Sequence, residues 1–466
     1  MSMISKFRDI NPHTAFLIIG LIYGIGFLFA TPAFQVPDEY EHFYRAIYVS
    51  EGHIVPEKLG DKSGVYVPES VRITSLIVSD EWYSFIENRD KMNLTSLFYV
   101  PFKSKYLVFE DISRIAVVTY SPVPYIVSGF AISLGKLFNL SPIFLMYLGR
   151  LANLLAWVLL TYYAIKITPV HKWVFFMISF IPVTLFEVAS LSADSFMLGL
   201  SFLVIAVFFN IALDDYKKKI NLKDIYILFI ILLLLALSKQ VYFILLFLVF
   251  LIPLEKFGSR KKMIIVSAFL FSSILLITGL WSFLVKDLYV PIVPQISVLG
   301  QILYILGDPF RFPFVVLNTF LQLGLSYQIL FVGNFVLDIP LPVWWIGIYL
   351  FTILPVSLLD KCDVEVRFKH KLISFIIFIM TSILLCAFVY FSWTPVGQNT
   401  IDGIQGRYFI PVLPLLFILF YKWSYLKDFD KKIPSIVRNN LNLIITGYVF
   451  IYLSITLLIF IIRYHI

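Results

Sequence analysis

Apolar stretches long enough to cross a lipid bilayer recur along almost the whole 466-residue chain, from residue 14 to residue 462. A helix needs about 20 apolar residues to span the hydrocarbon core. Charged residues make up only 14% of the chain and hydrophobic residues 60%, whereas a soluble domain carries about a quarter charged residues. The stretches do not alternate apolar and polar residues, as the strands of a membrane barrel do. The sequence therefore predicts an all-α polytopic membrane protein.

The apolar stretches predict about eleven transmembrane helices, with about 13 as the upper count. The polar break in "LSKQVY" separates two short spans. No small-x-small cleavage site follows the first stretch, which predicts an uncleaved anchor rather than a removed signal peptide. The predicted spans lie near 14–30, 143–164, 172–189, 195–213, 223–237, 240–254, 262–285, 342–359, 372–392, 407–423 and 441–462.

Short basic loops indicate which side of the membrane the ends of the spans face. Lys6 and Arg8 precede the first span. Later basic residues gather in "KITPVHK", "DDYKKKINLK", "EKFGSRKK", "KCDVEVRFKHK" and the stretch from Lys422 to Arg438. Cytoplasmic loops carry an excess of Lys and Arg. We therefore expect the N-terminus in the cytoplasm and residues 31–120 in a large extracytoplasmic loop. The net charge of +8 is explained by this orientation rather than by nucleic-acid binding.

Two further regions must lie outside if every basic loop is cytoplasmic. Residues 122–138, "PVPYIVSGFAISLGKLF", contain Gly, Ser and Lys136 and are typical of an interfacial helix. A short span within 121–140 is the alternative. Residues 286–340, which include "GDPFRFPFVVLNTF", form a second extracytoplasmic region. The whole chain, 1–466, is then a single membrane domain.

The segment "VPDEYEHF" places three acids beside the first span of a chain that otherwise avoids charge. Pro37 suits the first turn of a helix, so Asp38, Glu39 and Glu41 fall near the positive end of a helix dipole. Asp38, Glu41 and His42 share one face by three- and four-residue spacing. The pattern is typical of a solvated, dipole-matched helix start or of a carboxylate site. These residues could also bind a divalent metal ion, an alternative that one short cluster leaves open.

Several charged residues interrupt or flank apolar stretches on the side predicted to be outside. Lys239 lies between two spans, where a cation is a functional candidate, with snorkelling to the interface as the alternative. Asp194 in "SLSADSF" begins a span and could serve only as a helix cap. Arg150, Arg311 and Arg407 have anchoring or packing as alternatives. Basic residues at an outer face run against the orientation rule, which suggests a pocket for an anionic headgroup.

Six segments, which extend from residue 36 to about residue 414, resemble the bacterial domain-of-unknown-function family 2142 in their sequence and in their order along the chain. That family is similar to the GT-C membrane glycosyltransferases, which have a large first external loop with interfacial helices and an acid just after the first span. The resemblance implies a GT-C-like fold and sugar transfer from a polyprenyl-phosphate carrier. The segments are "VPDEYEHFYRAIYVSEGH", "YSPVPYIVSGFAISLGKLFNLSPIFLMYLGRLANLL", "SLSADSF", "LSKQVY", "VGNFVLDIPLP" and "QGRYFIPVLP".

By position, the resemblance implies Asp38 as the catalytic base, with Glu39 as the second candidate. A carboxylate there accepts the proton of an acceptor hydroxyl as that hydroxyl attacks the anomeric carbon. Preorganised cations stabilise the lipid phosphate that leaves. A single displacement inverts the anomeric configuration. The residues implied in substrate binding are Lys239, Arg407, Arg150, Arg311, Asp194, Glu41, His42 and Gln405.

The expected partners are a polyprenyl-phosphate sugar, a cell-envelope glycan acceptor and the lipid bilayer, without nucleic acid. We expect a multi-pass protein of the bacterial cell membrane whose active site is extracytoplasmic. The two cysteines, Cys362 and Cys386, indicate neither a disulfide framework nor a metal cluster, and no motif assigns a cofactor. Two other functions fit: an envelope polysaccharide polymerase or ligase, and a lipid or polysaccharide transporter. Transporters commonly contain repeated halves, and the sequence has no internal repeat.

Overall fold

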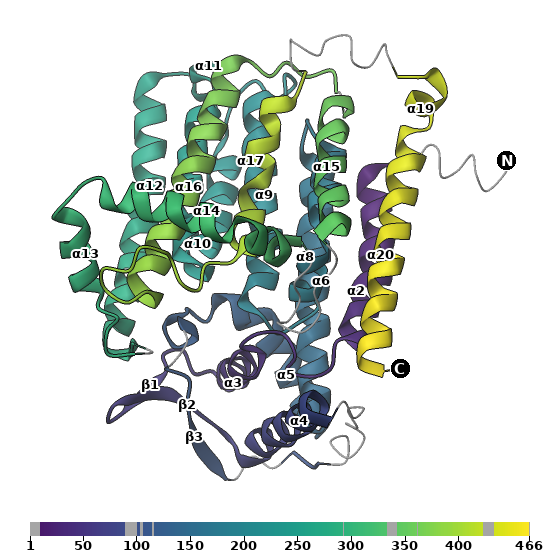
Figure 1. Cartoon of the computed structure of the whole chain (residues 1–466). Helices are drawn as coiled ribbons and strands as arrows, with labels where there is room; N and C mark the ends of the chain where they lie inside the picture. Colours follow the sequence, from purple (N-terminus) through teal and green to yellow (C-terminus); the bar gives the residue numbers. More distant parts are fainter. Residues whose placement is uncertain are drawn as a thin grey trace.

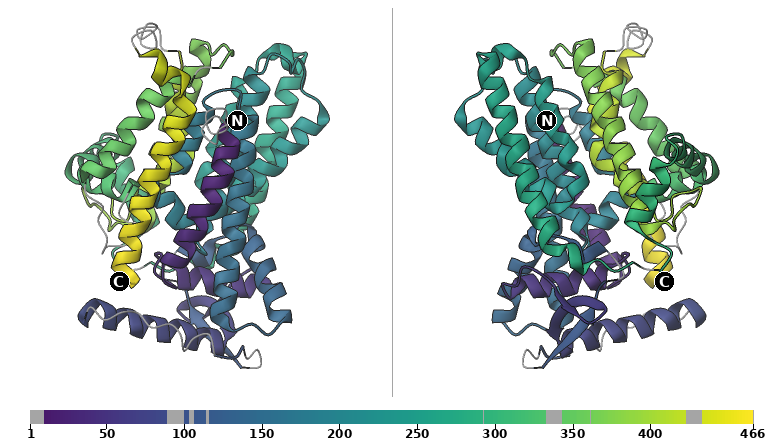
Figure 2. Two further views of the ribbon diagram at one scale, coloured as in Figure 1. Left: turned by 90° about the vertical axis from the view of Figure 1, so that its right-hand side faces the viewer. Right: turned by 90° about the vertical axis from the view of Figure 1, so that its left-hand side faces the viewer.

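The computed structural model is mostly helical, and its long helices run side by side in a bundle (Figures 1 and 2). The structure describes residues 10–88, 100–102, 106–113, 116–291, 293–332, 343–360, 362–422 and 433–465.

Six helices in this part of the chain are long and apolar enough to cross a membrane. Each coincides with one of the predicted spans. The prediction of a mainly helical, polytopic membrane protein is therefore confirmed. The six are α2 (Pro12–Ala30), α6 (Pro142–Ile167), α9 (Ala193–Leu213), α12 (Arg260–Val285), α16 (Phe368–Trp393) and α20 (Leu441–His465).

The other five predicted spans coincide with shorter or interrupted helices. Proline has no N–H to donate within a helix, and it begins α8 at Pro182 and lies inside η6 at Pro411. The passage of these five segments through the membrane stays a prediction. They are α7 (Lys172–Ser179) with α8 (Pro182–Val188), α10 (Leu222–Ser238), η4 (Gln240–Leu251), α15 (Val343–Leu359), and η6 (Gly406–Val412) with α17 (Leu413–Phe417) and η7 (Ile418–Phe420).

Short loops gather on one side of the bundle, the side on which α2 begins, which we call the basic face. α11 (Leu254–Phe257) and α19 (Ser435–Asn439) lie there, at the top of Figure 1. Lys256 joins two of the loops, because its Nζ donates to the carbonyls of Ile211 and Asp214 at 2.9 and 2.8 Å. The lysine thereby satisfies carbonyl groups at the negative end of α9.

The described part of residues 31–140 forms a layer on the opposite side, which we call the motif face (Figure 1). The C-terminal end of α20 reaches this side as well, where His465 Nε2 lies 3.0 Å from the carbonyl oxygen of Ala30. The helices of the layer are α3 (Glu39–Ser50), α4 (Glu69–Asn88) and α5 (Ile126–Leu137), with the short 3₁₀ helices η2 (Ala116–Thr119) and η3 (Val123–Tyr125).

A three-stranded antiparallel sheet accompanies these helices, in the order β1 (Glu57–Leu59), β2 (Lys62–Pro68) and β3 (Leu107–Asp111). The sequence predicted only helices in this loop, because strands this short give little periodic signal. Gly64 pairs with Asp111 across the sheet. A side chain at Gly64 would collide with the carbonyl oxygen of Glu110. The close approach of β2 and β3 therefore requires glycine at that position.

α5 lies within the region predicted as an interfacial helix or a short span. Its 12 residues extend about 18 Å at 1.5 Å per residue, too short for a hydrocarbon core of about 30 Å. Ser133 Oγ donates to the carbonyl of Ser50 at 2.8 Å, and Lys136 Nζ lies 2.8 Å from Glu51 Oε1. These contacts hold α5 against the end of α3. Its position relative to lipid stays a prediction.

The predicted region 286–340 contains η5 (Lys286–Leu288), α13 (Val298–Leu306) and the whole of α14 (Arg311–Val332). Residues 333–340 lie outside the described chain. This region packs against the loop that follows α16. Asn318 Nδ2 donates to the carbonyl of Asn399 at 2.9 Å, and the Gly397 N–H donates to Gln301 Oε1 at 3.0 Å. The region 286–340 is therefore joined by hydrogen bonds to the loop between α16 and η6.

The largest apolar core fixes α2 and thus the point from which the acidic motif starts. Phe16 of α2 packs edge-on against Trp157 of α6, with ring centres 5.2 Å apart. Near the other end of α2, Phe27 packs against Phe460 of α20, also at 5.2 Å. All four side chains are buried. Because close packing holds membrane helices together, these contacts place residue 31 firmly at the motif face.

Candidate functional site

Two ion pairs lie where the bundle meets the motif face, and we call them the ion-pair cluster. Lys239 Nζ lies 2.9 Å from Asp194 Oδ1, and Arg407 Nη1 pairs with Glu187 Oε1. Tyr408 joins the pairs, because its ring centre lies 4.3 Å from Lys239 Nζ and 5.7 Å from Arg407 Cζ. All four charged side chains are at most 18% exposed. Charges in such surroundings depend on their partners, since an unpaired buried charge is costly.

Each member of the cluster stands where a helix begins or ends. Glu187 lies in the last turn of α8, and Lys239 has an extended backbone between α10 and η4. Ser192 is the cap of α9, because its Oγ accepts the N–H of Asp194 at 3.1 Å. Asp194 is therefore not the helix cap, which was the alternative to a functional role. The helix breaks place polar side chains in an apolar bundle where their charges can meet.

Asp38 lies close to this cluster, at the start of α3. Its backbone is in the left-handed region, with φ of 63°, which costs a residue with a side chain about 1–2 kcal/mol. Its side chain makes no capping bond to α3, so a simple helix cap does not explain it. Burial raises the pKa of the Asp38 carboxyl; Arg407 lowers it and Asp194 raises it further. Asp38 is thus a partly buried acid within electrostatic reach of both ion pairs.

His42 lies one turn further along α3 and is buried. Its Nδ1 lies 2.7 Å from the Tyr125 hydroxyl, and its ring centre lies 6.3 Å from that of Tyr120. Burial lowers the pKa of His42 to about 4; Asp194 opposes this shift, while Arg407 and Lys239 add to it. The imidazole is therefore neutral at pH 7 and serves as a hydrogen-bonding partner. Burial also raises the pKa of the Tyr120 hydroxyl, to about 12.

The pKa of His42 predicts that the protein loses stability in acid. Below about pH 6.5, the ordinary value, the unfolded chain binds a proton at His42 that the folded chain does not bind. Thermal stability should therefore fall as pH decreases from 6.5 toward 4, by up to roughly 3 kcal/mol. Melting temperatures of purified wild type and His42→Gln across this range test the prediction. We expect a shallower acid slope for the variant; parallel curves would assign the lability to other groups.

Glu39 and Arg150 form a separate, fully buried ion pair. Arg150 Nε and Nη2 lie 2.7 and 2.5 Å from the two Glu39 oxygens. Glu39 Oε1 also accepts the N–H of Leu191 at 3.0 Å. Arg150 further donates to the carbonyls of Leu28, Thr31 and Pro32 at 3.2, 2.8 and 2.9 Å. Both residues were predicted as site residues; these contacts favour a role in holding the turn between α2 and α3.

The remaining predicted site residues lie at different distances from the cluster. Glu41 is buried in the first turn of α3. Gln405 is partly buried and precedes η6, two residues before Arg407. Arg311 contacts its own segment, because Nη1 donates to the carbonyl of Tyr304 at 2.6 Å and Nε lies 3.8 Å from Asp308. The structure therefore brings Asp38, Asp194, Lys239 and Arg407 together, while no contact described for Arg311 joins it to them.

A cavity of about 350 Å³ lies beside the cluster, between α10, η4, α12 and α16. Lys239 and Tyr408 belong to its wall, as do the aromatic side chains of Trp281, Phe388 and Trp393. Ligand sites are typically cavities of about 300–1,000 Å³ with apolar walls and a few polar groups. This cavity combines mostly apolar walls with two lysines, Lys239 and Lys286. It can accommodate an apolar chain that ends in an anion.

Sequence reasoning missed Glu187 and the aromatic wall of the cavity. Glu187 lies in "IPVTLFEVAS", an acid within an apolar stretch, and such residues are functional candidates by default. That signal was sufficient to find it. Trp281 gave no signal, because aromatic residues are common in membrane helices and at interfaces.

The charges of the site sum to a negative value. Lys239 and Arg407 contribute +2, and Asp194, Glu187 and an ionised Asp38 contribute −3, a net charge of −1. In the described ranges, no three His, Cys, Asp or Glu side chains come together in a group that could hold a metal ion. Asp38, Glu41 and His42, which the sequence left open as a metal site, therefore form no such group. An incoming anion must therefore compete with carboxylates for the two cations.

Comparisons with known proteins support one assignment. No curated protein and no solved structure matches the chain. A family model described as "Predicted membrane protein (DUF2142)" matches residues 21–416, a range that contains the acidic motif, the ion-pair cluster and the cavity wall. The match covers most of the chain, and we conclude that the protein belongs to this family of predicted membrane proteins, DUF2142.

Proposed function

We propose that the protein is a GT-C-like membrane glycosyltransferase. It transfers a sugar from a polyprenyl-phosphate donor to a cell-envelope glycan. In this proposal all eleven predicted segments cross the membrane, and the motif face is extracytoplasmic. The supporting observation is the proximity of Asp38 to Arg407 and Asp194, beside a largely apolar cavity that Lys239 lines. An acid, two cations and a largely apolar cavity are the features that this reaction requires.

In the proposed step, the oxygen of an acceptor hydroxyl attacks the anomeric carbon of the donor. A new carbon–oxygen bond forms while the bond from that carbon to the phosphate oxygen breaks. The electron pair leaves with the lipid phosphate, and the hydroxyl proton passes to the Asp38 carboxylate. Lys239 and Arg407 stabilise the charge that develops on the phosphate. One displacement inverts the configuration at the anomeric carbon.

The two existing ion pairs add a requirement to this mechanism. Lys239 and Arg407 are already paired with Asp194 and Glu187, so a phosphate would meet carboxylates as well as cations. We infer that the donor phosphate draws the cations away from these partners. Asp194 and Glu187 then hold the two cations in place while the site is empty, which avoids leaving a positive charge unpaired in the bundle.

A direct assay tests the proposal. The purified protein is reconstituted in vesicles with a defined polyprenyl-phosphate sugar and an oligosaccharide acceptor, and glycan products are measured by mass spectrometry. Addition of single sugars supports the transferase. Polymerised repeats indicate the polymerase or ligase. Movement of the lipid-linked sugar between leaflets without product indicates a transporter, and either of these last two outcomes overturns the proposal.

Lys239→Met should weaken donor use far more than acceptor use. Methionine keeps most of the apolar stem but removes the charge that faces the cavity. Losing the partner of a buried charge costs about 3–5 kcal/mol, which corresponds to several hundredfold in donor use. The measurement is the dependence of the transfer rate on donor concentration at saturating acceptor.

Lys136→Met is a matched control. Lys136 pairs with Glu51 at 2.8 Å, and its side chain is 15% exposed, against 18% for Lys239. The control therefore loses a lysine–carboxylate pair of similar geometry at the same face, but away from the cavity. Similar small effects at both positions would leave Lys239 as a structural residue and remove the phosphate role.

A further inference from the structure

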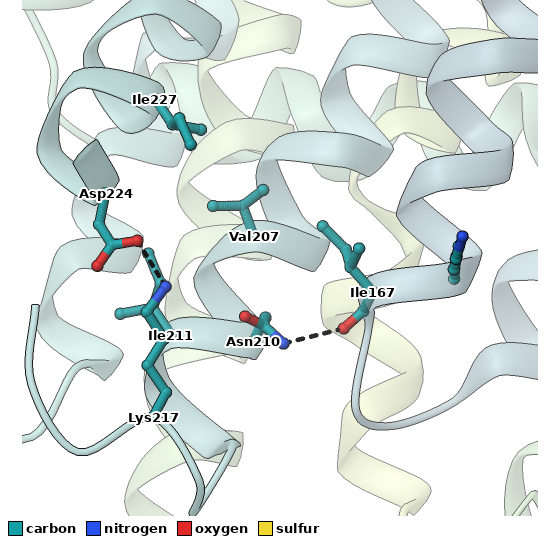
Figure 3. A pocket seen from close by; sticks show the side chains of 8 residues that line it. Ile167, Val207, Asn210, Ile211, Lys217, Asp224 and Ile227 are labelled. Carbon is teal, nitrogen blue, oxygen red and sulfur yellow. Dashed lines mark hydrogen bonds and ion pairs between the residues drawn. The ribbon is translucent and has the colours of Figure 1, made fainter.

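A second cavity of about 350 Å³ lies at the basic face, remote from the ion-pair cluster. It is formed by the ends of α6 and α9 and by the start of α10, and Figure 3 shows the side chains that line it. Lys217 and Asp224 face each other on one side, Asn210 points toward the carbonyl of Ile167, and Val207 lies between them. The wall is thus polar in part and apolar in part.

The polar side of this cavity is positively charged on balance. Lys217 Nζ lies 2.6 Å from Asp224 Oδ1. Asp224 also accepts the N–H of Asn221 at 3.0 Å, so this carboxylate is held by the cap of α10. Lys166 is exposed, and its Nζ lies 5.6 Å from the Tyr162 ring centre. Lys166 and Lys217 against Asp224 give a net charge of +1.

The apolar side of the cavity continues onto a surface suited to lipid. Val207 and Ile227 line it, and Ile227 is 37% exposed on the outside of α10. Tyr226, the preceding residue, is 65% exposed, and tyrosine is typical of the boundary between hydrocarbon and water. A ligand here can place a charged group among the lysines and an apolar chain along α10.

We propose that this cavity binds the headgroup of an anionic phospholipid, with its phosphate between Lys166 and Lys217. Basic pockets between the ends of membrane helices suit such headgroups, because each nearby lysine strengthens the attraction. Headgroup hydroxyls can also donate to Asp224, because each carboxylate oxygen can accept a second hydrogen bond besides those from Lys217 and Asn221. The proposal concerns the opposite face from the site of sugar transfer and does not depend on that activity.

Native mass spectrometry of the purified full-length protein, titrated with phosphatidylglycerol or phosphatidylcholine, tests this proposal. We expect preferential binding of phosphatidylglycerol. Lys166→Gln should weaken that binding about fivefold, the usual contribution of one lysine near a lipid surface. Val207→Phe should weaken it as well, because the larger side chain fills the cavity without changing the charge. Melting temperatures of both variants establish that they are folded.

Lys369→Gln is the control, because Lys369 is exposed near the start of α16 at the same face and does not line the cavity. Equal losses for Lys369→Gln and Lys166→Gln would mean that only general surface charge attracts the lipid, and would overturn the proposal. Equal binding of both lipids would overturn it too. Competition by soluble glycerol phosphate at the same concentration would identify a phosphate site that does not require lipid.

Discussion

Asp38→Asn is expected to abolish sugar transfer while the protein remains folded and inserted in the membrane. Asparagine keeps the size of the side chain but cannot accept the proton of the acceptor hydroxyl. It also tolerates the left-handed backbone that Asp38 adopts. General-base catalysis contributes about 10²–10⁴-fold, so the rate constant for transfer should fall by at least about a hundredfold. The measurement combines initial rates with the melting temperature of each protein.

The raised pKa of Asp38 adds two checks. Because burial favours the protonated carboxyl, activity should fall with decreasing pH through a pKa above that of an ordinary aspartate. A carboxyl with a raised folded-state pKa lowers stability once it ionises. Asp38→Asn should therefore melt no lower than wild type at neutral pH. A loss of activity below tenfold, or a parallel loss of folding, would contradict a role as base.

Arg150→Met is expected to destabilise the whole protein rather than one step of a reaction. The change leaves Glu39 buried without its cation and leaves three backbone carbonyls without their donor. Breaking a buried pair on one side costs about 3–5 kcal/mol, a large part of the usual stability of a folded protein. Yield of monodisperse protein in mild detergent and its melting temperature measure the effect.

The double variant Arg150→Met, Glu39→Met separates a structural role from a catalytic one. Replacing both members of a buried pair by apolar residues is often close to neutral, so the double variant should recover part of the lost stability. Glu39→Gln alone should act mainly on stability for the same reason. An Arg150→Met protein with unchanged stability and no activity would place Arg150 in the reaction, as the sequence first suggested.

Sequence alone could not predict that Asp38 and Glu39 have different roles in the site. The two acids are adjacent, and spacing favours neither of them for catalysis. The distinction depends on Arg150, whose chain position is 111 residues from Glu39. No local pattern encodes such a contact. Asp194, Lys239 and Arg407 were predictable as candidates because charge within a membrane protein is costly and therefore informative.

The fold shows a similar boundary between what hydropathy can and cannot predict. Hydropathy located the long helices, such as α6 and α16, because a mainly apolar segment of 26 residues can form few other structures in lipid. Hydropathy does not predict the helix geometry where proline or polar residues interrupt an apolar stretch. The break at Lys239 was visible, but the 3₁₀ geometry of η4 after it was not. Tertiary packing decides such segments, and the short strands of the motif face as well.

The left-handed backbone of Asp38 has a consequence for how this position can vary. Glycine, asparagine and aspartate adopt that conformation at lower cost than other residues. If every residue were introduced at position 38 and the library were sorted by expression level, this small group should be enriched. Sorting by enzymatic output should then retain aspartate alone. Position 38 would then have two independent requirements, a residue that adopts the left-handed backbone and a side chain with a carboxylate. Few substitutions at this position would satisfy both.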